Sequence, residues 1–186
     1  MRDAAETKRR LLAAATEEFA ERGIAGARVD RIAAAAGCNK AMIYSYFGNK
    51  DRLFDTVFGE SVGNFVIDVP IDAHDLPDYA GKLFDRYEER PETLRLAIWH
   101  RLERPEGKWV TEIVLANELR LGLLQRAQDE GRLSKHYTPL ELLVLIQSIS
   151  TAWATTNTEL GVRTTIPREQ RRALVVDAVR RLIAED

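Results

Sequence analysis

Cysteine and histidine are scarce in this chain of 186 residues, which has one cysteine and three histidines. With Cys38 alone, an internal disulfide is impossible and no cysteine-rich metal site can form. His74, His100 and His136 are scattered and lack the spacing of metal ligands. A Gly-rich phosphate loop, a nucleophile elbow and an HExxH-type pairing are missing as well. These absences predict a protein that is not an enzyme and that has no metal or cofactor.

Long apolar runs are also absent. No stretch approaches the roughly 18–20 consecutive apolar residues that a membrane span needs. The chain begins with Met1, Arg2 and Asp3 and shows no apolar block of the kind found in signal peptides. Together with the single cysteine, this predicts a cytoplasmic protein that does not enter a membrane.

Helix breakers are few, because the chain has only 6 prolines and 11 glycines. Hydrophobic residues make up 45% and charged residues 30%, with Ala, Leu, Glu and Arg prominent, a mixture that favours helix. Apolar residues recur at helical spacing and predict an all-α fold of about nine helices without strands. Pro91, Pro139 and Pro167 stand where helices are expected to begin, since a first helical turn tolerates a missing N–H.

The expected helices form two domains, a three-helix N-terminal domain over residues 1–48 and a second helical domain over residues 49–186. The helices are expected at about 3–22, 28–36, 40–47, 49–67, 78–89, 91–104, 108–131, 139–160 and 167–184. The net charge of −2 hides an asymmetry, because the first 52 residues have 10 Lys and Arg against 7 Asp and Glu. A basic N-terminal part followed by an acidic remainder is expected when only the N-terminal part binds phosphate groups.

Residues 21–54 have the layout of a helix-turn-helix. A short helix with apolar Val29 and Ile32 is followed by a tight turn over residues 36–39 and a second short helix with apolar Ile43 and Phe47. Asn39 is expected to cap the second helix by accepting the Met42 amide. This pattern predicts a recognition helix that presents its exposed face to the major groove of DNA.

The candidate DNA contacts share a place on or beside that exposed face or at a helix start. They are Arg28, Asn39, Lys40, Ala41, Met42, Tyr44, Ser45, Tyr46 and Lys50. Lys40 can bond a guanine edge or a phosphate, and Ser45 and Ala41 permit close approach to bases. Tyr44 either donates a hydrogen bond to a phosphate or only packs against the core. Lys50 either binds a phosphate or is only a solvated residue at the start of a helix. Cys38 is either an inert turn residue or a redox-sensing thiol.

This stretch resembles the TetR family of bacterial regulators. The matching features are Thr7, Leu11, Leu12, Ala13, Ala14, Phe19, Gly23, Val29, Ile32, Ala33, Ala36, Gly37, Tyr44, Phe47, Lys50 and Leu53. The resemblance implies an N-terminal DNA-binding domain, a helical C-terminal domain that binds an effector, and a homodimer formed through the last two helices. It carries phosphate contact over to Tyr44 and Lys50, and base or backbone contact to Asn39–Met42 and Ser45–Tyr46.

The expected partners are therefore double-stranded operator DNA, a small-molecule effector and a second copy of the chain. The expected function is that of a repressor released from a pseudo-palindromic operator, with activation left as an alternative. A second alternative is a helix-turn-helix dimer whose body binds a protein partner or has no effector.

Two departures from the family pattern matter for the DNA contacts. The family usually opens the first motif helix with Thr or Ser, where this chain has Ala27 and Arg28, so that the usual capping bond is lost. At Ala41 and Met42 the family often has a glycine and a small polar residue. The operator sequence therefore cannot be inferred from relatives.

The candidate ligand-binding residues are aromatic or isolated polar groups on otherwise apolar helices. They are Trp99, His100, Asn117 and Trp153. For each of them, an ordinary place in the core is the alternative. The sequence does not identify the ligand, and it favours an apolar or aromatic molecule only mildly.

Overall fold

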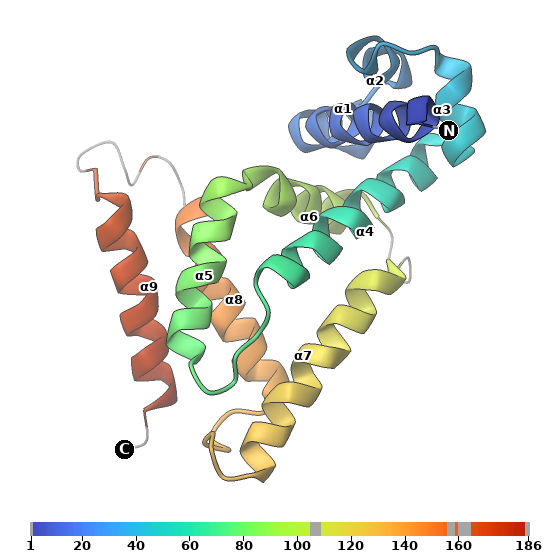
Figure 1. Ribbon diagram of the computed structural model, residues 1–186. Helices are drawn as coiled ribbons and strands as arrows, with labels where there is room; N and C mark the ends of the chain where they lie inside the picture. Colours follow the sequence, from blue (N-terminus) through green and yellow to red (C-terminus); the bar gives the residue numbers. More distant parts are fainter. Residues whose placement is uncertain (1, 105–108, 156–158, 160–164, 185–186) are drawn as a thin grey trace. The chain divides into compact units, whose positions relative to one another are not determined.

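The computed structural model describes residues 2–104, 109–155, 159 and 165–184 (Figure 1). Over these residues the chain is all-helical and has nine helices, which confirms the expected fold class. The helices are α1 (Arg2–Gly26), α2 (Val29–Ala36), α3 (Lys40–Phe47), α4 (Lys50–Asp68), α5 (Leu76–Glu89), α6 (Pro91–Glu103), α7 (Thr111–Asp129), α8 (Pro139–Thr155) and α9 (Arg168–Ile183). None of the described helices is both long enough and apolar enough to cross a bilayer.

Most of these bounds lie within a few residues of those expected, but α1 is longer. Gly23 was expected to end the first helix; instead helical residues continue to Gly26 beyond a kink. Gly23 has φ 72° and ψ −179°, a conformation open essentially to glycine alone. A Cβ at this position would also lie 2.8 Å from the Trp99 ring of α6. Gly23 therefore both redirects α1 and lets α6 approach it.

The chain groups into two compact units. The first contains Met1–Asn64 and Pro91–Ile113, and the second contains Phe65–Arg90 and Val114–Asp186. Each unit has its own cluster of buried apolar side chains. The domain boundary expected between residues 48 and 49 stays a prediction, because the grouping by contacts adds α6 and most of α4 to the N-terminal helices.

In the first unit, α1 packs against α2 and α6 around an aromatic centre. The rings of Phe19 and Phe54 meet edge to face with centroids 5.2 Å apart. Ile32 of α2 and Ile43 of α3 are completely buried in the same cluster. This core fixes the two short helices of the motif, which are too short to be stable alone.

In the second unit, α5 packs against both α8 and α9. Polar contacts reinforce the α5–α9 pair, since Asp85 accepts from Arg168 at 2.7 Å and from Arg172 at 2.6 Å. Glu88 accepts from both terminal nitrogens of Arg171. The apolar faces of α5 and α8 bury Leu83, Phe84, Leu142 and Ile146 between them and their neighbours.

Candidate nucleic-acid interface

The turn between α2 and α3 is built on Gly37, which has the left-handed conformation with φ 64° and ψ 40°. Its N–H donates to the Ala34 carbonyl at 3.1 Å, and the Cys38 N–H donates to the Ala33 carbonyl at 3.0 Å. These bonds satisfy the last carbonyls of α2 and end that helix. The chain then reverses within three residues into α3.

Asn39 caps α3 as expected. Its Oδ1 accepts the Met42 N–H at 2.9 Å, and its backbone is extended, as an N-cap requires. The cap fixes the first turn of α3, where free amides and the helix dipole favour a phosphate oxygen.

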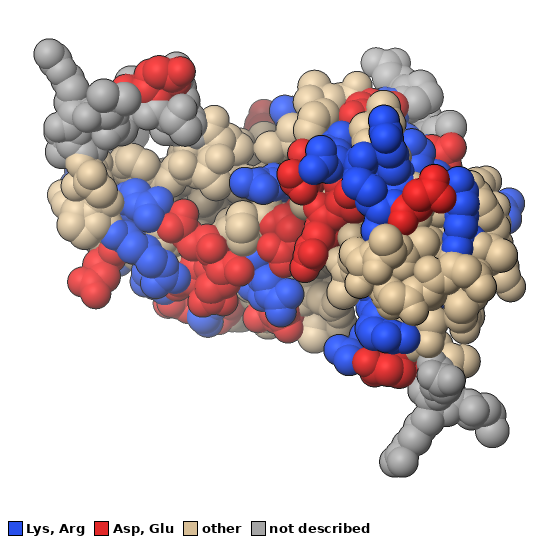
Figure 2. Space-filling view, turned by 90° about the horizontal axis from the view of Figure 1, so that it is seen from above, with Lys and Arg blue, Asp and Glu red and all other residues tan. Residues whose placement is uncertain are grey.

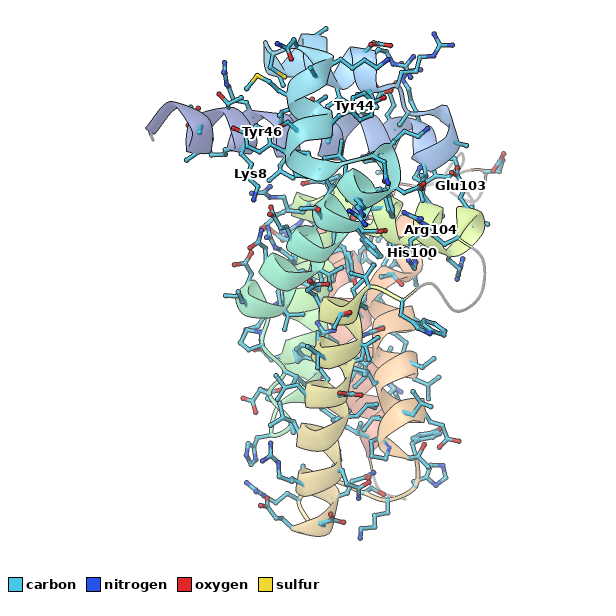
Figure 3. All side chains as sticks on the ribbon, turned by 90° about the vertical axis from the view of Figure 1, so that its right-hand side faces the viewer. Lys8, Tyr44, Tyr46, His100, Glu103 and Arg104 are labelled. Atoms are coloured by element: carbon cyan, nitrogen blue, oxygen red, sulfur yellow. The ribbon has the colours of Figure 1, made fainter. Side chains whose placement is uncertain are left out.

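The side chains of α3 divide into a buried and an exposed set. Ile43 and Phe47 are buried, which confirms the core role of Phe47. Tyr44 is 44% exposed and Tyr46 is 40% exposed (Figure 3). The other candidates on this helix are exposed Lys40, Ala41 and Ser45 and half-buried Met42. All six candidate contacts of α3 are therefore at least partly exposed, around the two buried side chains.

The missing cap of α2 is replaced by a carboxylate from α1. Arg28 occupies the N-cap position and makes no side-chain capping bond. Instead Glu18 accepts the Arg28 N–H at 2.9 Å and the Arg31 Nε–H at 2.8 Å. Burial works to raise the pKa of Glu18, but the bonds from Arg31 and Arg28 outweigh it and hold the pKa below its ordinary value. The Arg28 side chain stays exposed beside the motif.

The two candidate lysines have partners within the first unit. Lys40 pairs with Asp30 at 3.0 Å, and the hydrogen bond to that carboxylate raises the lysine pKa. Lys50 donates to the carbonyls of Ala27 at 3.1 Å and Ala25 at 3.3 Å. An ammonium group has three N–H donors, so these two bonds leave one for a phosphate. A DNA role for either lysine stays a prediction.

Helix α6 braces the N-terminal helices through contacts that sequence reasoning missed. Trp99 donates its Nε1–H to the Ala20 carbonyl at 3.2 Å. Glu103 accepts the Ala25 N–H at 2.6 Å. Both partners lie near the kink of α1, some 80 residues earlier in the chain, and no local pattern signals such a pairing.

Arg104, directly after α6, ties this region to α4. It bonds Asp55 at 2.7 Å and Asp51 at 3.2 Å, with its guanidinium carbon 5.4 Å from the centre of the Phe54 ring. Figure 3 shows Glu103 and Arg104 together with His100. The His100 ring stacks on Phe54 with centroids 6.2 Å apart.

The four candidate ligand residues are divided between the two units. Trp99 and His100 belong to the first, where each has the packing contacts just described. Asn117 and Trp153 belong to the second, where Asn117 accepts from Arg120 at 3.4 Å and Trp153 packs on the apolar cluster. A ligand role for any of the four stays a prediction.

Charge and metal-ligating groups add little to the interface. On the face shown in Figure 2, Lys and Arg side chains lie among Asp and Glu side chains. In the part of the chain that the structure describes, no cluster of His, Cys, Asp and Glu has the makings of a metal site.

Comparison with known proteins decides the family. The model of the bacterial regulatory proteins of the tetR family matches residues 11–57. The model of the tetracyclin repressor-like C-terminal domain matches residues 75–181, more than half of the chain. The chain belongs to the TetR family. Its helix-turn-helix is thus the family's DNA-binding motif, as the resemblance implied.

Two curated relatives of this TetR-family chain are repressors. It is 46% identical over 102 residues to the HTH-type transcriptional repressor SCO4008 of Streptomyces coelicolor, covering 55% of this chain and 53% of that one. It is 28% identical over 105 residues to the HTH-type transcriptional repressor NicS of Pseudomonas putida, covering 53% and 50%. The matched part spans about half the length of these curated relatives.

Solved structures agree over nearly the whole TetR-family chain. SCO4942 from Streptomyces coelicolor superposes with a TM-score of 0.82 at 36% identity, covering 95% of this chain and 98% of that one. FadR from Bacillus subtilis, crystallised with stearoyl-CoA, has a TM-score of 0.67 at 20% identity, covering 95% and 98%. The second likeness concerns the fold alone.

Proposed function

We propose that the protein is a transcriptional repressor that binds a pseudo-palindromic operator as a homodimer and is released by a small-molecule effector. The observation that carries this proposal is the short capped helix α3, in which Tyr44, Ser45 and Tyr46 are exposed while Ile43 and Phe47 are buried in the core. A helix of this kind fits the major groove of B-DNA. The curated repressors matched over about half their length support repression as the outcome.

The residues of α3 and its flanks take distinct roles in this proposal. Tyr44, Tyr46 and Lys50 contact phosphates and position the helix, whereas Lys40, Ala41 and Ser45 lie against base edges. Lys40 must exchange Asp30 for DNA, and its exposed ion pair is weak enough for this exchange. The remaining contacts, from Arg28, Asn39 and Met42, are to the DNA backbone or to neighbouring bases.

A dimer through α8 and α9 is the second part of the proposal. Both helices leave large apolar side chains exposed, namely Leu140 and Val144 on α8 and Leu174 on α9. Pairing of α8 and α9 with their copies forms a four-helix interface that covers such residues. Two-fold symmetry of the dimer then requires an operator with two inverted half-sites.

Release by an effector is the third part. The effector binds better to the protein when the two recognition helices are wrongly spaced for DNA. By thermodynamic linkage, the effector then lowers the affinity for DNA, and DNA lowers the affinity for the effector by the same factor. Helix α4 contributes residues to both units and is our candidate for transmitting this coupling. FadR of Bacillus subtilis, with its bound stearoyl-CoA, is a case in which the same fold holds a small molecule.

The dimer gives the experiment that tests this proposal. Val144→Asp places a carboxylate on an α8 side chain that is 52% exposed, and Leu119→Asp does the same on α7 at a side chain that is 57% exposed. Because like charges would meet across the two-fold axis, Val144→Asp should weaken the dimer about 100-fold or more. It should also abolish binding to a two-half-site duplex. Leu119→Asp should change neither in sedimentation and mobility-shift measurements; a fully dimeric, DNA-binding Val144→Asp protein would refute this interface.

A further inference from the structure

Arg120 on α7 is a buried arginine of the second unit that has no charged partner among the described residues. It is 6% exposed, and among the described residues it is the one buried residue with a formal charge. Within that part of the chain it makes one long hydrogen bond, from Nη1 to Asn117 Oδ1 at 3.4 Å, and no ion pair. Its Nε is buried without an acceptor. A guanidinium has five N–H donors, so the one long bond to Asn117 leaves donors of Arg120, its Nε–H among them, for other acceptors.

Arg104 in the first unit shows how the same chain supplies a counter-charge to another guanidinium with a buried side chain, although its Nε, like that of Arg120, has no acceptor among the described residues. The Arg104 side chain is as buried as Arg120, but it bonds the carboxylates of Asp51 and Asp55. Burying an unpaired cation costs several kcal/mol, a cost that a paired arginine largely recovers. No described residue supplies a counter-charge to Arg120, so an anion from outside this part of the chain can take that place.

Two phenols of α5 lie beside Arg120. Tyr79 is 1% exposed, and its hydroxyl interacts with the Arg120 guanidinium but forms no well-aligned hydrogen bond among the described residues. Burial raises the pKa of Tyr79 and raises that of Tyr87 to about 12, and the positive charge of Arg120 offsets only part of each rise. Both hydroxyls thus stay protonated near neutral pH and can donate. The three side chains together supply donors in excess of acceptors.

The surroundings of this donor cluster are apolar. The Tyr87 ring packs at a tilt against Phe65 with centroids 4.6 Å apart, and Leu124, one turn after Arg120, is completely buried. Small-molecule sites combine such an apolar lining with a few convergent polar groups. A planar guanidinium with flanking hydroxyls matches the two oxygens of a carboxylate better than it matches a neutral molecule.

We propose that Arg120, with the hydroxyls of Tyr79 and Tyr87, binds the carboxylate of an organic acid whose apolar body packs among the neighbouring apolar side chains. This inference rests on the proposed function and deepens it, because it assigns the effector to a chemical class. The acid replaces the missing counter-charge of Arg120, so its binding stabilises the second unit.

Two acids and their neutral counterparts test the proposal on the whole protein. Sodium octanoate and sodium benzoate are compared with 1-octanol and benzyl alcohol by calorimetry and thermal unfolding, with sodium sulfate as an inorganic anion at equal ionic strength. At about ten times its Kd, at least one acid should raise Tm by about 3–6 °C, and the alcohols and sulfate should not. Equal effects of an acid and its alcohol, equal effects of sulfate, or no binding of either acid would overturn the proposal.

Substitution of Arg120 separates a ligand role from a structural one. Arg120→Met should raise Tm without ligand, because it removes an unpaired buried charge, and should raise the Kd of the acid at least tenfold. Arg126→Met, at an exposed arginine of the same helix, should change neither. A lower Tm with unchanged acid binding would show that Arg120 is structural and would refute the proposal. Tyr79→Phe removes one hydroxyl only, and it should raise the Kd of the acid about fivefold while the protein stays folded.

DNA binding distinguishes failure of this inference from failure of the proposed function. The Arg120→Met protein should still bind duplex DNA in a mobility-shift assay, because the substitution lies outside the first unit. If the protein binds DNA but binds neither acid, the proposed anion site is wrong and the proposed function as a DNA-binding regulator is retained. If neither the natural protein nor the variant binds any duplex, the proposed function itself is wrong.

Discussion

The cap of α3 offers a substitution that separates folding from DNA binding. Asn39→Asp keeps an oxygen acceptor for the Met42 N–H, which Asn39 now accepts at 2.9 Å. Aspartate caps helices as well as asparagine does, and its charge is favourable at a helix N-terminus by about 0.3–1 kcal/mol. The free energy of unfolding should therefore stay the same or rise slightly. On DNA the new charge faces phosphates, and a unit charge 4 Å away costs about 1 kcal/mol even at the dielectric constant of water.

The expected result is thus an unchanged urea midpoint with DNA affinity reduced at least about fivefold, measured by fluorescence anisotropy at fixed salt. Asn39→Ala should behave differently, losing about 1 kcal/mol of unfolding free energy with the cap. Asn49→Ala is a matched control for that loss of stability, because the Asn49 Oδ1 accepts the Arg52 N–H at 2.8 Å at the start of α4. Gln125→Glu adds the same charge to an exposed position of α7 and should leave DNA affinity within about twofold. If Asn39→Asp left DNA affinity unchanged, the N-terminus of α3 would not face DNA.

Three further substitutions test separate contacts. Gly23→Ala should lower the free energy of unfolding by about 2–4 kcal/mol, because of its positive φ and the approach of Trp99, whereas Gly26→Ala should be neutral or stabilising in the same urea titration. Glu18→Gln should destabilise the protein at neutral pH. Since the folded pKa of Glu18 lies below 4.5, the advantage of the natural protein should shrink as pH falls below that value. Lys50→Ala should weaken all duplexes alike and reduce the salt slope of binding by about one; a change in sequence preference alone would contradict a phosphate role.

Local signals in the sequence were enough to predict much of the N-terminal motif. The Asn39 cap, the glycine turn and the buried position of Phe47 follow from residues within a few positions of one another. Pro91 and Pro139 begin α6 and α8, as their fixed φ and missing N–H predict. These features need no knowledge of the tertiary structure.

Contacts between distant segments were beyond that reasoning. Trp99 was considered for a ligand cavity because an indole on an amphipathic helix looks the same in sequence whether it lines a cavity or binds a backbone carbonyl. Its bond to Ala20 joins residues 79 positions apart. The replacement of the α2 cap by Glu18 is likewise invisible locally, since the sequence shows only that Arg28 cannot cap. Arg120 gave no signal either, because a single arginine on a helix is ordinarily exposed.

Selection of binding sites from a pool of random duplexes, at moderate salt and with the natural protein, tests the central claim most directly. If two copies of α3 read DNA from a symmetric dimer, the enriched sequences should contain an inverted repeat whose half-sites lie about one helical turn apart or somewhat more. Enrichment of a single unrepeated half-site would contradict the dimer, and no enrichment over the starting pool would contradict DNA recognition by α3.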